Sequence, residues 1–277
     1  MENLRYSVLM SVYFKEQPAY LDAAIHSMLA QTVPSDDFVV VCDGPLTPAL
    51  DAVIDRYVTA HPAIFHIVRL EQNVGLGRAL NTGMDACKYE YIARMDTDDI
   101  AFPDRCARQL ERFAADEHLD IISGTVLEFE GDVQNILSQK TLPKTDAGIR
   151  AYARQRNPFN HPCVMYKKSA VLDAGEYQDF PLFEDYYLWI RMLANGARAY
   201  NLSDPLLYMR AGAEMYSRRG GFAYLKKVLR FRRYMLKNKH CSLFDFLKTV
   251  CGQAVICLMP IKLRIFLYSR LLRKKTA

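Results

Sequence analysis

The chain contains 277 residues, 51% of them hydrophobic, and its 36 Lys and Arg against 31 Asp and Glu give a formal net charge of +5. This length and apolar content suffice for one large α/β domain, or for one domain with an appendage. Seven Cys without a CxxC pair, together with six scattered His, argue against a disulfide framework and a structural zinc site. We therefore expect reduced thiols in a cytoplasmic protein. The N-terminal residues have no basic segment before a long apolar stretch, so we expect no signal peptide.

Strand-like and helical segments alternate through the first hundred residues. Apolar, β-rich runs predict four strands, at 6–14, 37–44, 65–70 and 90–96. Apolar residues at helical spacing predict helices at 19–32, 48–61 and 77–88. This alternation predicts a parallel sheet covered by helices, in which ligands bind outside the carboxyl ends of the strands.

Polar residues lie where these strands end, at Ser11 to Tyr13, Asp43-Gly44 and Asp96 to Asp99. The last group places three carboxylates within four positions, and such crowding raises carboxylate pKa values and costs stability unless a cation lies among them. An Asp-x-Asp at a strand end can hold Mg²⁺ or Mn²⁺, which prefer one or two carboxylates plus substrate phosphates. The alternative is an acidic turn that caps the next helix.

The second half of the chain is less regular. We expect a helix at 105–118, a strand at 119–130 and a polar, loop-rich stretch over 131–160. A strand followed by a short helix is expected over 161–175. A helix closed by Asn-Gly is expected over 183–196, and a strand pair around a turn over 197–210.

Five blocks of sequence follow one another as in family 2 glycosyltransferases with the GT-A fold, and the chain resembles that family over roughly residues 5–210. The blocks are SVLMSVYFKE, VVVCDGP, NVGLGRALNTGMDAC, YIARMDTDD and FEDYYLWIRMLANG. A later segment, YMRAGAEMYSRRGG, is similar to enzymes that build bacterial capsule, exopolysaccharide and O-antigen units on a lipid carrier. The resemblance implies a Rossmann-like mixed sheet flanked by helices, with a nucleotide-sugar half at about 1–104 and an acceptor half at about 105–210. It also implies an inverting, metal-dependent transfer of a hexose from a UDP-sugar, with Mn²⁺ or Mg²⁺.

The resemblance also implies roles for individual residues of the donor site. Asp98 would bind the metal ion, and Asp96 the ribose or a metal-bound water. Asp43 would accept a hydrogen bond from the uracil ring. The remaining donor-site residues would be Ser11, Tyr13 and Glu16 at the base and ribose, Asn73, Gly75 and Arg78 at the nucleotide and its phosphates, and Arg218 and Arg219 at a diphosphate of the donor or the lipid carrier.

Two departures from the family pattern affect this donor site. Phe14 stands where the family often has Asn. Some relatives supply a His to the metal after the last strand, whereas residues 208–216 contain none, so the third metal ligand is not identified.

The acceptor half contains Glu184-Asp185 at the start of a predicted helix. The resemblance implies that this pair supplies the general base, with Asp185 at the matching position; the alternative is favourable charge at a helix N-terminus. For Trp189, the only Trp, we favour core packing over a sugar platform. His161 lies near the expected acceptor side, and a structural role is at least as well supported.

The C-terminal segment 211–277 carries 16 Lys and Arg and two acids, a balance of +14, whereas the other 210 residues carry 20 basic and 29 acidic residues, a balance of −9. Basic residues alternate with large apolar ones over 224–236 and 246–275, and no uncharged span reaches 18 residues. We therefore expect basic amphipathic helices that lie on an anionic membrane surface. The alternatives are a helical cap on the catalytic domain and a nucleic-acid arm, which no accompanying motif supports.

These observations together predict a peripheral enzyme at the cytoplasmic face of the inner membrane. It would transfer galactose or glucose to an undecaprenyl-diphosphate-linked saccharide. Alternatives are a transferase with a soluble or lipopolysaccharide-core acceptor, a non-catalytic nucleotide-sugar-binding protein, and a nucleotidyltransferase. The last alternative lacks support, because this sequence has no Gly-rich phosphate loop after the first strand.

Overall fold

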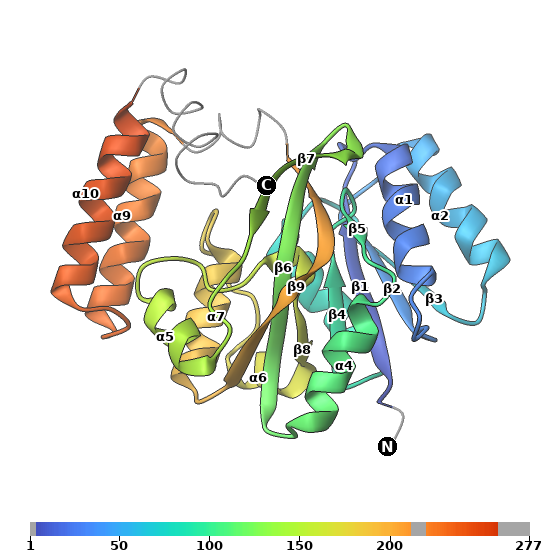
Figure 1. The fold of residues 1–277 in the computed structure, drawn as a ribbon. Helices are drawn as coiled ribbons and strands as arrows, with labels where there is room; N and C mark the ends of the chain where they lie inside the picture. The colour runs from blue at the N-terminus through green and yellow to red at the C-terminus, as the bar shows by residue number, and fades with distance from the viewer. Residues whose placement is uncertain (1–3, 212–219, 260–277) are drawn as a thin grey trace.

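A computed structural model describes residues 4–211 and 220–259. Its centre is a nine-stranded mixed sheet in the order β3-β2-β1-β4-β8-β6-β9-β5, with β7 paired to β6 (Figure 1). The strands are β1 (Tyr6–Val12), β2 (Phe38–Cys42), β3 (Phe65–Arg69), β4 (Tyr91–Met95), β5 (Ile100–Ala101), β6 (Leu119–Glu130), β7 (Asp132–Lys140), β8 (Met165–Lys167) and β9 (Arg198–Arg210). The helices are α1 (Pro18–Leu29), α2 (Pro48–Ala60), α3 (Leu76–Ala86), α4 (Arg105–Ala115), α5 (Asp146–Ala153), α6 (Lys168–Asp173), α7 (Glu184–Ala194), α9 (Gly221–Lys237) and α10 (Leu243–Leu258), with a 3₁₀ turn, η1 (His161–Cys163).

The first four strands form the parallel part of the sheet, as the alternating pattern predicted. In the register, Val12 lies beside Cys42, and Met10 lies beside Met95. Every residue of β2 is buried because helices cover both faces of this part of the sheet. Because these strands are parallel, the loops that follow β1, β2 and β4 leave the sheet at the same edge, the one formed by the carboxyl ends of the strands. Their polar residues are brought together there.

The remaining strands make the sheet mixed, and they curl it back toward that edge. β8 runs antiparallel to both β4 and β6, while β6 and β9 form a long parallel pair. β5 follows directly after Asp99 and pairs with the end of β9, Ile100 opposite Tyr208. The end of β9 is thereby held next to the acidic turn after β4.

Two predictions for the second half of the chain were wrong. The stretch 131–160 is not loop-rich, because it contains β7 and α5; β7 lies at an edge of the sheet, and its exposed side makes its sequence polar. The stretch 197–210 is one strand rather than two. Its turn-like residues Ser203 to Pro205 form an irregularity in the pairing with β6, where the Thr125 hydroxyl donates to the Ser203 carbonyl at 2.8 Å.

Hydrophobic cores lie on both faces of the sheet. One packs α1, α2 and α4 against the sheet, and the other packs α3, α6 and α7 against the opposite face. α9 belongs to this second core: Phe231 and Met235 are fully buried, and the Phe231 ring stacks on Phe183 with centroids 4.8 Å apart. α9, which follows the predicted start of the basic segment, is thus packed against the acceptor half.

We expect Gly83→Ala to destabilise the fold, because α3 lies so close to the sheet that an added Cβ would be 2.5 Å from side-chain atoms of Leu9 and Val41. Overpacking of this kind costs about 1–3 kcal/mol. Gly252→Ala in α10 is the matched control, since its Cβ would meet open space. Denaturant unfolding should show a lower midpoint for Gly83→Ala alone; equal midpoints for the two variants would contradict this packing.

Candidate functional site

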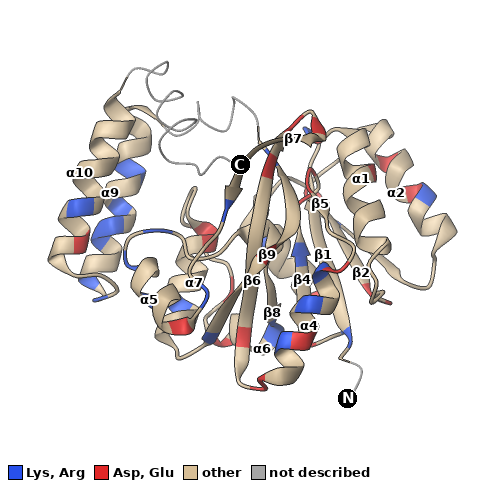
Figure 2. Cartoon of the chain, viewed as in Figure 1, with Lys and Arg blue, Asp and Glu red and all other residues tan. Residues whose placement is uncertain are grey.

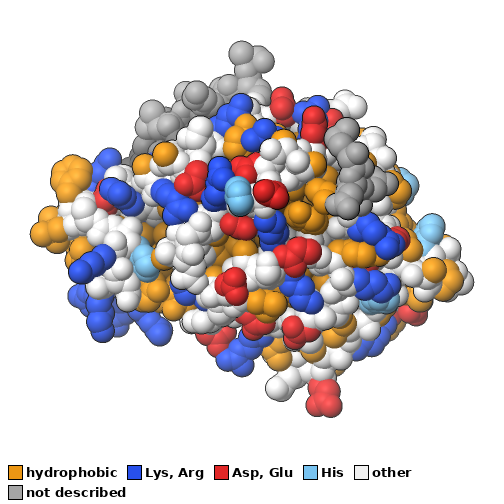
Figure 3. Space-filling model, turned by 90° about the horizontal axis from the view of Figure 1, so that it is seen from below, with side chains coloured by type: hydrophobic (Ala, Val, Ile, Leu, Met, Phe, Trp, Pro, Cys, Tyr) orange, Lys and Arg blue, Asp and Glu red, His pale blue; other side chains and the backbone are white. Residues whose placement is uncertain are grey.

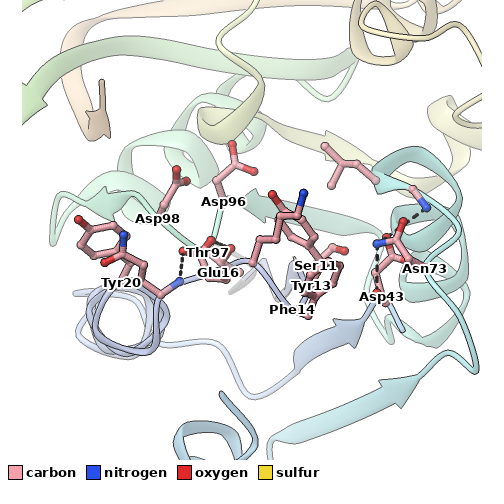
Figure 4. Close-up of a pocket in the computed structure, with 14 residues that line it drawn as sticks. Ser11, Tyr13, Phe14, Glu16, Tyr20, Asp43, Asn73, Asp96, Thr97 and Asp98 are labelled. Carbon is pink, nitrogen blue, oxygen red and sulfur yellow. Dashed lines mark hydrogen bonds between the residues drawn. The ribbon is translucent and has the colours of Figure 1, made fainter. Parts of the chain in front are cut away.

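The predicted strand-end residues line one cavity of about 700 Å³ at the edge of the sheet (Figure 4). Asp96, Thr97 and Asp98 lie at one end of it, Asp43 and Asn73 at the other. The predicted donor-site residues that line it are Ser11, Tyr13, Glu16, Asp43, Asn73, Gly75, Asp96 and Asp98. Arg78 is absent from the lining, and Arg218 and Arg219 lie outside the described residues.

Asp96, Asp98 and Asp99 form a compact acidic cluster, with one carboxylate oxygen of each within 4.8 Å of the others. Burial, together with the charge of Asp96 and Glu16, raises the pKa of Asp98 to about 7. Burial also raises the pKa of Asp99 well above its usual value. An all-oxygen set of this kind fits a hard divalent cation such as Mg²⁺ or Mn²⁺.

Two arginines that sequence reasoning missed hold this cluster. Arg94, on β4, is 1% exposed and donates to Asp96 Oδ1, while its Nε and Nη1 find no hydrogen-bond partner within residues 4–211 and 220–259. Arg210, the last residue of β9, donates its backbone N–H to Asp99 Oδ1 at 2.8 Å and its Nε to the Asp98 carbonyl at 3.0 Å. Arg94 could have been noticed in the sequence, because it is a charged residue inside the apolar run Tyr91 to Met95. Nothing in the sequence around Arg210 indicated its role.

The loop after β1 is tied to the acidic turn. The Thr97 hydroxyl donates to Glu16 Oε2 at 2.6 Å, so Glu16 lies beside the acidic cluster. Tyr13 and Phe14 are 38% and 50% exposed and meet edge to face, with centroids 5.9 Å apart. These rings line the middle of the cavity and offer apolar surface to a planar ligand.

Asp43 organises the other end of the cavity. Its carboxylate accepts hydrogen bonds from Asn73 Nδ2 at 2.9 Å, from the Val74 N–H at 2.7 Å and from the Gly75 N–H at 3.1 Å. Gly44 is needed beside it, because it has φ +86° and a Cβ there would be 2.7 Å from the Asn73 nitrogen. Asp43 thus fixes the 73–75 loop and also borders the cavity.

Arg78 follows that loop on the first turn of α3. Its exposed guanidinium pairs with Asp179, in the loop before α7. This pair connects the two halves of the chain at the surface.

Glu184 and Asp185 occupy the first turn of α7 and are half-buried. Asp185 accepts from Asn157 Nδ2 at 2.6 Å and from the Tyr186 N–H at 2.6 Å. Burial raises the pKa of both carboxyls, and the hydrogen bonds from Tyr186 and Asn157, followed by the charge of Lys140, partly offset the rise at Asp185. Sequence reasoning missed Asn157 and Lys140, which belong to the stretch that was expected to be loop.

Trp189 is fully buried, and its ring meets Phe159 edge to face at 5.6 Å, which confirms core packing. His161 lies beside it, with Nε2 at 2.9 Å from the Tyr177 hydroxyl. Burial lowers the pKa of His161 well below its usual value, so this imidazole is neutral and supports the core.

Comparison with known proteins agrees with this arrangement. Residues 7–174 match the family model for Glycosyl transferase family 2. The chain belongs to glycosyltransferase family 2. The amylovoran biosynthesis glycosyltransferase AmsE of Erwinia amylovora is 37% identical over 265 residues, which cover 96% of this chain and 98% of the relative. The UDP-Gal:alpha-D-GlcNAc-diphosphoundecaprenol beta-1,3-galactosyltransferase of Escherichia coli is 33% identical over 273 residues, which cover 98% and 97%.

Solved structures of low identity share the fold of this glycosyltransferase. The mannosyltransferase PcManGT of Pyrobaculum calidifontis, in complex with GDP-Man and Mn²⁺, has a TM-score of 0.61 at 15% identity; the match covers 91% of this chain and 69% of that one. S. aureus TarS 1–349, in complex with UDP-GlcNAc, has a TM-score of 0.60 at 16% identity, and the match covers 84% and 67%. The GT-A fold inferred from the sequence is therefore confirmed.

We expect Asp98→Asn to stabilise the protein in the absence of metal. A carboxyl whose pKa rises from 3.8 to about 7 on folding destabilises the folded state once it ionises, so stability falls as pH rises between these values. The neutral amide removes the cost of burying this charge beside Asp96 and Glu16 above pH 7. A gain of about 1 kcal/mol would raise Tm by about 2–4 °C in a domain of this size.

Thermal unfolding in EDTA at pH 8 measures this effect. Asp85→Asn, at an exposed position of α3, is the control and should leave Tm unchanged. A Tm for Asp98→Asn at or below that of the wild type would show that the ionised Asp98 carboxylate does not destabilise the metal-free fold.

Proposed function

We propose that this enzyme transfers a hexose, galactose or glucose, from a UDP-sugar to an undecaprenyl-diphosphate-linked saccharide during assembly of a bacterial surface polysaccharide. The E. coli relative, matched over nearly the full length of both chains, acts on such a lipid-linked acceptor with UDP-Gal. The observation that carries the proposal is the cavity with an acidic cluster at one end and the Asp43 loop at the other. Its two ends suit the diphosphate and the base of one nucleotide.

In this proposal Asp98 and Asp96 hold Mn²⁺ or Mg²⁺, and two structural neighbours with bound nucleotide sugars, one with Mn²⁺, support a cation–nucleotide site on this fold. When bound, the cation offsets the negative charge of the donor diphosphate and of the departing nucleotide. The proposed contacts to the nucleotide remain those of Ser11, Tyr13, Glu16, Asp43, Asn73, Gly75 and Arg78, with Arg218 and Arg219 at a diphosphate.

The proposed general base is Asp185. An acceptor hydroxyl attacks the anomeric carbon of the donor sugar, and the bond from that carbon to the diphosphate oxygen breaks on the opposite face, which inverts the centre. The hydroxyl proton passes to Asp185, and Asn157 keeps that carboxylate oriented. Glu184 beside it adds negative charge at the acceptor side.

A turnover assay tests the proposed activity directly. Purified full-length enzyme is given a synthetic lipid-diphosphate-linked acceptor, Mn²⁺ and a panel of UDP-hexoses, with and without EDTA. We expect one UDP-hexose to be transferred, and no transfer in EDTA. Asp98→Ala should also lose transfer, because the alanine side chain has no oxygen with which to bind the metal ion. Full activity of Asp98→Ala in EDTA would exclude a metal-dependent reaction. Transfer to a soluble or lipopolysaccharide-core acceptor alone would favour the second candidate substrate, and UDP-sugar binding without turnover would indicate a non-catalytic protein.

We expect Asp185→Asn to lower transfer by about 10²-fold or more, while the affinity for the UDP-sugar stays close to that of the wild type. The amide keeps the size of the side chain but cannot accept the proton. Because burial raises the pKa of Asp185, wild-type activity should fall on acidification at a higher pH than for an exposed carboxyl. The variant should lose this acidic limb.

Steady-state kinetics across pH, with calorimetric titration of the donor, measures both effects. Asp173→Asn, an exposed carboxylate at the end of α6, is the control. An equal loss of donor binding in Asp185→Asn would assign this residue to the donor site or to the fold.

We also propose that the enzyme works peripherally at the cytoplasmic face of the inner membrane, where a lipid-linked acceptor is presented. Within the described residues, none of the helices has the length and apolar character needed to cross a membrane.

A further inference from the structure

α9 and α10 form an antiparallel helical hairpin beside the acceptor half (Figure 1). One side of α9 is buried, since Phe231 and Met235 pack in the catalytic core and Val228 is buried as well. These three side chains of α9 are therefore not available to a membrane, whereas Phe222, near the start of the helix, is 74% exposed. Any apolar surface that the hairpin presents comes chiefly from α10.

α10 carries an exposed stripe, here called the α10 stripe, that runs along its whole length. Its residues are spaced by three or four positions, so they share one face of the helix over about 21 Å. They are Phe244, Leu247, Cys251, Val255 and Leu258, and the four apolar members are 72%, 51%, 63% and 52% exposed. The opposite side of α10 carries Asp245 and Cys257, which are buried. This stripe is not the apolar face that packs the helix onto the protein.

The surface around the stripe is basic. Between residues 220 and 259 the only acidic residue is Asp245, and it is engaged by Ser242 in a capping box and by Gln155 at 2.6 Å. The exposed basic residues of the hairpin are Lys226, Lys227, Arg230, Arg233, Lys237, Lys239 and Lys248. The ribbon of α9 carries several Lys and Arg positions in Figure 2, and Figure 3 shows hydrophobic and basic side chains side by side at this end of the molecule.

We propose that the α10 stripe, with the surrounding Lys and Arg, is the surface by which this enzyme docks on an anionic lipid bilayer. An apolar stripe bordered by cations matches a helix lying in the interfacial plane, with its apolar side chains among the acyl chains and its cations among the phosphates. A second copy of the chain fits this surface less well, because two such basic surfaces repel each other. Lys248, which is exposed and follows Leu247 in the sequence, places a cation beside the stripe that can pair with a headgroup phosphate.

Docking through α10 also brings the bilayer close to α7, because α9 packs against that helix through Phe231 and Tyr186. α9 stacks Phe231 on Phe183, and the next two residues of the chain are Glu184 and Asp185. The hairpin therefore connects the docking surface to the segment of the proposed base through this ring contact. This part of the inference rests on the proposed function, whereas the docking itself does not.

Vesicle flotation with the full chain tests the proposal, because truncation before α9 would uncover the core. The test variant replaces Phe244, Leu247, Val255 and Leu258 by Gln, and Leu247→Gln alone serves as a milder variant should the quadruple variant unfold. The control replaces Leu137 and Leu172, which are exposed apolar residues elsewhere on the molecule, by Gln. Circular dichroism checks that each variant is folded.

We expect the wild type and the control to float with phosphatidylglycerol-containing vesicles at low salt, to be partly released by salt, and to bind phosphatidylcholine vesicles at least tenfold more weakly. The quadruple variant should lose at least tenfold in binding to the anionic vesicles, and Leu247→Gln should lose a smaller part. Wild-type binding by the folded stripe variants, or equal binding of the wild type to both vesicle types, would overturn the proposal. So would a dimer in sedimentation that the stripe variants abolish.

The activity of the variants separates this inference from the proposed function. Stripe variants should transfer sugar normally to a water-soluble short-chain acceptor and poorly to an acceptor embedded in vesicles. Docking without any transfer by the wild type would leave the docking surface standing and would overturn the proposed function.

Discussion

The crowding of three carboxylates at the end of β4 is the constraint around which this site is built. Burial and the charge of Asp96 raise the pKa of both Asp98 and Asp99, with further contributions from Glu16 at Asp98 and from Asp98 at Asp99. Among the described residues, Arg94 and Arg210 offset part of this effect. Arg94, on β4, donates a hydrogen bond to Asp96, and Arg210, at the end of β9, donates its backbone N–H to Asp99. The end of β9, which pairs with β5, thus helps to keep the acidic turn in place. A cation among the carboxylates would remove the remaining repulsion, and the energetic cost of the metal-free site makes binding more favourable.

The sequence predicted the donor end of the site well, because the residues involved follow directly after buried parallel strands. In such a sheet, Asp43 and Asp96 must emerge at one edge wherever the helices lie. The acceptor side depends on contacts between distant segments. Asn157 reaches Asp185 across 28 positions of sequence, and no local pattern marks that pair. The strand character of β7 was missed for a different reason: it is an edge strand with an exposed side, so its sequence is polar.

The basic C-terminal segment shows the same division between composition and packing. Its charge and its alternation of basic and apolar residues were evident in the sequence, but they did not distinguish helices that pack on the core from helices that face outward. The two helices differ in this respect: α9 buries Phe231 in the core, whereas α10 carries most of the exposed apolar side chains of the hairpin, such as Phe244. A long amphipathic pattern therefore does not identify a membrane surface until the partner of each apolar face is known.

Anomalous X-ray scattering from crystals soaked with Mn²⁺ and UDP most directly tests whether the acidic cluster is the cation–nucleotide site. We expect one strong Mn²⁺ peak beside the Asp98 carboxylate and the UDP diphosphate, with the uracil ring at the Asp43 end of the cavity. A Mn²⁺ peak away from Asp96 and Asp98, or UDP bound outside this cavity, would contradict it.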